Sequence, residues 1–161
     1  MKLLKKIACT LLTVFLINAS LCEPVLAVEE LDIVELEATV EAVEGQSGQF
    51  VQSRSTTFID TSINMSFSAD GMYIEIHTDM NTTASVVGAK DIKIQKKGLF
   101  GWTTVATSTG GEAYNVGGCV VYLNYAGAEY EEIYRVTCTH YGEVDEYREL
   151  YHETLGYTCI Y

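Results

Sequence analysis

A cysteine and a histidine two positions apart, Cys138 and His140, are the residues best suited to chemistry in this chain. A thiolate beside an imidazole forms the core of many nucleophilic sites. On a β-strand, however, successive side chains of one face stand about 7 Å apart, which is too far for direct proton transfer unless the side chains rotate towards each other. We therefore expect Cys138 to be a core residue with His140 at the rim of the core, and we predict no catalytic residue.

The remaining titratable residues offer little for a metal site. His77, His140 and His152 lack the HxH or HxxxH spacing of zinc ligands. The acidic runs at 129–132 and 143–149 have no regular calcium-ligand register, although acidic loops at the ends of a β domain can still converge on one ion. We predict no metal ligand and no cofactor, and calcium binding stays open.

Tyrosine is unusually frequent, with eleven copies, ten of them from Tyr114 onward. Aromatic side chains are favoured in strands, where they pack between neighbours. Rigid aromatic rings also supply contact area to a protein or sugar partner at low entropic cost. The predicted binding residues are Trp102, Tyr122, Tyr125, Tyr130, Tyr147 and Tyr151.

Apolar and polar residues alternate from Phe58 onward, which indicates β-strands. Segments 63–67 and 72–76 flank the turn sequence Ala69-Asp70-Gly71 and predict a hairpin. Further strands are predicted at 90–97, 102–107, 119–125 and 133–140, with a final edge strand within 147–161. Short strands at this spacing predict an all-β fold, an antiparallel β-sandwich of about seven strands.

Three cysteines follow the first strands: Cys119, Cys138 and Cys159. If the chain returns antiparallel after the turn at 126–128, Cys119 and Cys138 reach the same end of the domain and both point inward. Cys159 falls at the other end. The sequence therefore predicts a Cys119–Cys138 disulfide, with two reduced core cysteines as the alternative.

The first 27 residues resemble a secretory signal peptide. Lys2, Lys5 and Lys6 precede a mostly apolar run, and Val25-Leu26-Ala27 offers small residues for cleavage before Val28. A retained anchor and a lipoprotein acylated at Cys22 are the alternatives, although Leu21 is larger than a lipoprotein signal prefers. Residues 28–57 carry seven acidic residues before the first basic one, Arg54, and we expect this leader to be mostly disordered. The β domain spans 58–161.

The formal net charge of −12 predicts repulsion of nucleic acids and of anionic membrane surfaces. Partners of the exported chain are then a protein or a carbohydrate. The function that follows is a secreted, non-catalytic binding module at the cell surface or outside the cell. A small secreted hydrolase, with a cross-strand site from residues such as His77, Glu75, Cys138 and His140, and a purely structural surface component are the alternatives.

Three segments carry a family resemblance: 90–97 ending in Gln-Lys-Lys, Trp102-Thr103-Thr104-Val105, and 134–138, which reads Tyr-Arg-Val-Thr-Cys. They look like central strands of immunoglobulin-like and fibronectin type III-like domains. The whole layout is similar to small secreted proteins of Gram-positive, clostridia-type bacteria. The resemblance implies an immunoglobulin-like sandwich, and it implies no particular function because such folds host many unrelated sites.

Overall fold

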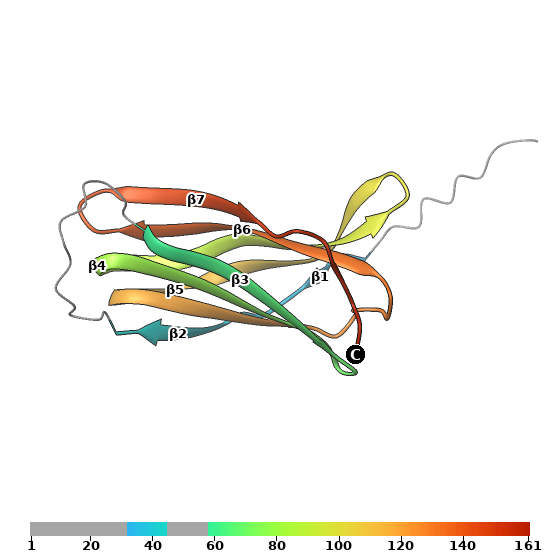
Figure 1. Cartoon of the computed structure of the whole chain (residues 1–161). Helices are drawn as coiled ribbons and strands as arrows, with labels where there is room; N and C mark the ends of the chain where they lie inside the picture. Colours follow the sequence, from blue (N-terminus) through green and yellow to red (C-terminus); the bar gives the residue numbers. More distant parts are fainter. Residues whose placement is uncertain (1–31, 45–57) are drawn as a thin grey trace, which may run out of the picture. The chain divides into compact units, whose positions relative to one another are not determined.

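The computed structural model describes residues 32–44 and 58–161, and every regular element in these two ranges is a β-strand (Figure 1). The eight strands are β1 (Val34–Glu35), β2 (Thr39–Val43), β3 (Phe58–Ser68), β4 (Gly71–Gly98), β5 (Gly101–Tyr125), β6 (Ile133–Glu143), β7 (Tyr147–Glu153) and β8 (Tyr157–Thr158). The predicted all-β class is confirmed, with eight strands in place of about seven. The sheet is mixed, because β1 runs parallel to β5 while the other pairs are antiparallel.

Two long strands, β4 and β5, organise the sheet. The main order is β1-β5-β4-β6-β7, while β2 pairs with β5, β3 with β4 and β8 with β6. A register break between Asp79 and Ala84 divides β4 into two stretches. The first stretch pairs with β3 and the second with β6. The sequence pattern predicted two separate strands, at 72–76 and 90–97, whereas the structure joins both into the single strand β4.

The two stretches of the sheet enclose one core. Ile74 and Ile76 from the first stretch of β4, Ile94 from the second and Val136 from β6 are all buried in the same apolar cluster. Across this core the Thr78 hydroxyl lies 2.7 Å from His140 Nδ1. Buried residues from both stretches of β4 therefore belong to one core cluster.

The predicted hairpin of segments 63–67 and 72–76 is confirmed, whereas the predicted return of 133–140 beside 119–125 is wrong because β4 lies between these strands. Ser68 pairs with Gly71, Gly98 with Gly101 and Glu143 with Tyr147, so each connection lies where turn residues interrupt the alternation. Alternation also assigned the faces correctly, because Ile92 and Ile94 are buried while Lys93 is exposed. Period-two burial is what a sheet with one face on a core requires.

Part of the acidic leader is ordered, so the prediction of a mostly disordered segment is wrong for residues 34–43. There β1 and β2 pair with β5, and Leu36, Ala38 and Val40 pack on the core. These apolar residues alternate with acidic or polar ones, a pattern that the high charge obscured. Residues 28–31 and 45–57 of the leader and the predicted signal peptide, with Cys22 and the cleavage site at Val28, lie outside the described residues.

The predicted disulfide is absent. Cys119, Cys138 and Cys159 are free and buried. The prediction assumed that β6 returns beside β5, whereas β4 lies between these two strands. Cys119 is paired with Thr78 of β4, and Cys138 with His152 of β7. The chain leaves the turn after β5 towards the far side of β4, and this separates the two thiols.

Candidate functional site

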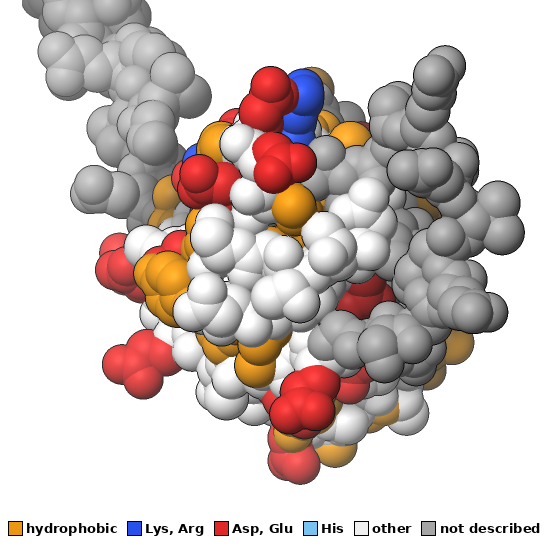
Figure 2. All heavy atoms as spheres, turned by 90° about the vertical axis from the view of Figure 1, so that its left-hand side faces the viewer, with side chains coloured by type: hydrophobic (Ala, Val, Ile, Leu, Met, Phe, Trp, Pro, Cys, Tyr) orange, Lys and Arg blue, Asp and Glu red, His pale blue; other side chains and the backbone are white. Residues whose placement is uncertain are grey.

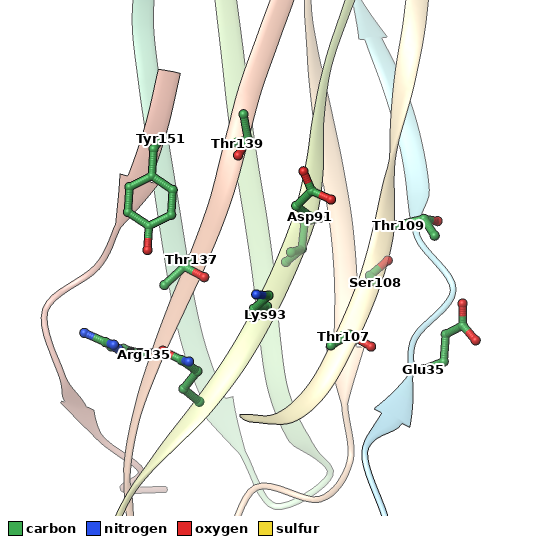
Figure 3. A pocket seen from close by; sticks show the side chains of 12 residues that line it. Glu35, Asp91, Lys93, Thr107, Ser108, Thr109, Arg135, Thr137, Thr139 and Tyr151 are labelled. Carbon is green, nitrogen blue, oxygen red and sulfur yellow. Dashed lines mark hydrogen bonds between the residues drawn. The ribbon is translucent and has the colours of Figure 1, made fainter. Parts of the chain in front are cut away.

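A polar pocket of about 560 Å³ lies on the outer face of the sheet where β1, β5, β4, β6 and β7 run side by side. We call it the polar-face pocket. Figure 3 shows its side chains projecting from all five strands. The lining residues are Glu35, Asp91, Ile92, Lys93, Gln95, Thr107, Ser108, Thr109, Arg135, Thr137, Thr139 and Tyr151.

Strand alternation places these polar groups. On β6, Tyr134, Val136 and Cys138 enter the core, so the intervening Arg135, Thr137 and Thr139 face outward into the pocket. On β4 the same alternation directs Lys93 outward and Ile94 inward. The hydroxyl groups of Thr137 and Thr139 therefore lie side by side on the outer face of β6, although neither residue belongs to a recognisable catalytic motif.

A backbone irregularity shapes the pocket at Asp91. This residue has a φ of 53°, and the register of β4 against β6 shifts between Lys90 and Lys93. On the neighbouring strand Gly110, which pairs with Lys90, has a φ of 85°, and a Cβ placed there would lie 1.9 Å from the carbonyl oxygen of Ala89. Left-handed conformations of non-glycine residues are uncommon and concentrate at functional sites.

Charges of both signs line the pocket. Arg135 is fixed by three contacts: its Nε donates to Gln95 Oε1 at 2.8 Å, its Nη1 lies 2.9 Å from Glu153, and its guanidinium lies 4.5 Å from the Trp102 ring centre. Lys93 and Asp91 are exposed and form no ion pair with another described residue. Counting only partners among the described residues, the pocket presents one ion-paired cation, Arg135, and charged side chains without an ion pair, Lys93 and Asp91 among them.

The predicted aromatic residues do not form one patch. Tyr151 lines the polar-face pocket, and Trp102 contacts its Arg135. Tyr122 bonds Glu41, Tyr130 packs on Tyr161, and Tyr147 lies beside Lys90. The prediction of Tyr125 as a binding residue is wrong. Its side chain is buried and its ring packs on Tyr134, so the ring is not available to a partner.

Cys138 and His140 do touch, which corrects the expectation that they stand too far apart. Cys138 Sγ lies 3.5 Å from His140 Nε2, and His152 Nδ1 lies 3.1 Å from the same nitrogen. Rotation about the side-chain bonds closes the distance that strand spacing alone suggests. His140 is also fully buried and does not lie at the rim of the core.

This histidine cluster is electrostatically unsuited to nucleophilic chemistry. Burial raises the pKa of the Cys138 thiol to about 12, and burial together with nearby His152 lowers the pKa of His140 to about 4. A neutral thiol beside a neutral imidazole is a structural pair at neutral pH. Thr78 completes the cluster, since its hydroxyl donates to the Gly88 carbonyl oxygen at 3.3 Å and lies 2.7 Å from His140 Nδ1.

The end of the domain at the β6–β7 turn is acidic. Figure 2 faces this end and shows acidic side chains spread across it, with few basic ones. Asp145 and Glu146 lie in this turn, and Glu143 is the last residue of β6 before it. Within residues 32–44 and 58–161, no three His, Cys, Asp or Glu side chains converge as metal ligands do.

Sequence reasoning missed Asp91, Lys93 and Arg135 as site residues. Their signal was available, because 90–97 and 133–140 were both predicted as strands with polar residues on one face. That the two polar faces lie side by side depends on the pairing of β4 with β6.

In the part of the chain that the structure describes, there is no helix long and apolar enough to cross a membrane. Comparison with family models, with curated proteins and with solved structures finds no match to this chain.

Proposed function

We propose that the chain is a secreted, non-catalytic module with an immunoglobulin-like β-sandwich, which binds a glycan through the polar-face pocket. The observation that carries the proposal is the pocket itself: about 560 Å³, bordered by five strands and lined mostly by polar side chains. Its size is within the range of small-ligand sites. The lysine-rich, apolar N-terminal pattern supports export, and the single core between two stretches of sheet supports the sandwich.

The chemistry of the lining favours a saccharide. Thr107, Thr109, Thr137 and Thr139 carry hydroxyls that both donate and accept hydrogen bonds, which matches the hydroxyls of a sugar ring. Tyr151 is 63% exposed and offers its ring as an apolar surface at the margin. Lys93 supplies a cation for an acidic substituent.

A binding role is supported over hydrolysis by where the nucleophilic groups lie. The described residues that line the pocket include neither a cysteine nor a histidine. Cys138 and His140 lie on the opposite, inner face of β6 and are fully buried. A substrate in the pocket would be separated from them by the strand.

The test is binding of the purified protein, with β1 and β2 retained because Glu35 lines the pocket, to an array of neutral and acidic oligosaccharides, followed by variants on the best binder. We expect Tyr151→Ala and Lys93→Ala each to weaken binding about tenfold or more. Tyr114→Ala is the matched control, because Tyr114 is 61% exposed and lies outside the pocket.

Tyr151→Ala is expected to change the free energy of unfolding by less than about 0.5 kcal/mol, because the side chain is exposed. Failure to bind any saccharide, or equal binding by wild type and both pocket variants, would overturn the proposal.

A further inference from the structure

The connection between β4 and β5 ends in two large apolar side chains that touch almost nothing. Leu99 is 97% exposed and Phe100 is 103% exposed. Figure 1 shows this hairpin, in yellow, projecting from the rest of the strands. We call Leu99 and Phe100 the hairpin tip.

Folding does not explain these two residues. Gly98 pairs with Gly101, which leaves Leu99 and Phe100 as a two-residue turn, where Asn-Gly or Asp-Gly is usually favoured. Gly101 has a φ of 138° and so adopts a conformation that L side chains avoid. The glycine allows two apolar side chains to occupy the turn, although at this exposure they contribute no burial to the fold.

Amphipathic residues follow directly behind the tip. Lys97 pairs with Trp102 across the hairpin, and Lys97 Nζ lies 5.7 Å from the centre of the Trp102 ring. Tryptophan and lysine are the residues that proteins place at the level of lipid headgroups. At about 3.3 Å per residue, this pair would lie at the interface when the tip is in the acyl region.

The exposed apolar surface continues beyond the hairpin. A Cβ at Gly156 would lie 3.0 Å from the Trp102 ring, so the segment after β7 passes next to this ring. Its neighbour Leu155 is 80% exposed.

We propose that the hairpin tip inserts into the interfacial layer of a lipid bilayer. The two side chains of the tip together offer about 400 Å², roughly half of what one partner contributes to a standard protein interface. Insertion into a fluid acyl layer needs no complementary shape, so a small convex tip is sufficient for reversible contact.

Apolar area, not charge, drives this contact. The chain as a whole is acidic, and Lys96 behind the tip is already paired with Glu129 and Glu132 at 2.9 and 3.5 Å. The net charge therefore predicts no attraction to anionic headgroups, and it does not oppose insertion into a zwitterionic bilayer. The inference is independent of glycan binding on the outer sheet face.

The chain carries its own probe, because Trp102 is its single tryptophan. We expect phosphatidylcholine vesicles to shift Trp102 emission to the blue and to co-sediment with the protein. The double variant Leu99→Ser, Phe100→Ser should bind at least about tenfold less, and Leu155→Ser should bind slightly less than wild type. Leu150→Ser, on β7, is the control and should bind like wild type.

A second set of vesicles, containing phosphatidylglycerol, distinguishes insertion of the apolar tip from electrostatic attraction to anionic headgroups. Binding only to these vesicles, with no loss in the double variant, would overturn tip insertion in favour of an electrostatic contact. Absence of wild-type binding to both vesicle types would also overturn tip insertion and would favour a protein as the partner of the tip. Urea unfolding of the double variant should match wild type, and Tyr151→Ala should sediment normally even if it no longer binds glycan.

Discussion

The two faces of β6 differ in burial and in proposed function, and residue type alone would have predicted the opposite assignment. Its inner face carries Cys138 and His140, whose residue types are the ones best suited to nucleophilic chemistry, and both are fully buried. Its outer face carries Arg135, Thr137 and Thr139, which line the polar-face pocket. The face with the cysteine and the histidine is therefore part of the core, and the face with Arg135 and the two threonines forms the candidate site.

Desolvation explains why the inner face is chemically quiet. Burial favours the uncharged form of each group, which raises the pKa of Cys138 and lowers that of His140. A nucleophilic site needs the charged thiolate, whereas a core needs neutral, hydrogen-bonded groups. Burial therefore decides whether a cysteine beside a histidine can act as a nucleophile.

The largest expected effect comes from placing a charge on each face. Val136→Asp puts an unpaired carboxylate in the core and should cost about 4 kcal/mol or more, enough to unfold a marginally stable domain. Thr139→Asp, on the outer face, should fold and change stability by less than about 1 kcal/mol. Urea unfolding followed by far-UV circular dichroism measures both. Similar losses in the two variants would show that the outer face is also core.

Removal of the buried imidazole should have the next largest effect. His140→Ala leaves a cavity and removes the partner of the Thr78 hydroxyl, so we expect a loss of about 2–4 kcal/mol. His77→Ala is the control. The His77 side chain is only half-buried, and its contact is with the exposed Glu75 at 3.6 Å, so its removal leaves no cavity in the core. The control should change the free energy of unfolding by about 0.5 kcal/mol or less. Equal effects would mean that the His140 cluster adds nothing to the core.

A smaller effect is expected from pH. The pKa of His140 is about 4 in the folded chain and about 6.5 when unfolded, so the unfolded state binds a proton first as the pH falls. Stability should therefore be complete above about pH 6.5 and decline towards pH 4, by about 2–3 kcal/mol from this group. Urea unfolding across this range measures the slope. His140→Gln should be less stable but should show a shallower slope, and an unchanged slope would assign the pH dependence to other groups.

Local pattern in the sequence was sufficient for the strands that bury one face. The alternation around Ile63, Ile74, Ile94 and Val136 identified strands and their inward sides correctly, and glycine and aspartate marked the turns. The same alternation in 34–43 was masked by glutamates, because high charge suggested disorder. In this segment Glu35, Glu37 and Glu41 are exposed while Leu36, Ala38 and Val40 pack on the core, so the acidic side chains keep their hydration and the strands still form.

Which strands become neighbours is a matter of tertiary structure. The all-β class, the positions of the turns and the alternation of buried and exposed side chains follow from the period of two and from turn chemistry, and so could be predicted from the sequence. Only the fold decided that β4 lies between β5 and β6, which keeps Cys119 and Cys138 apart and sets Lys93 beside Thr137 in one pocket. Strand order is set by packing between residues distant in the chain, and no local pattern encodes it.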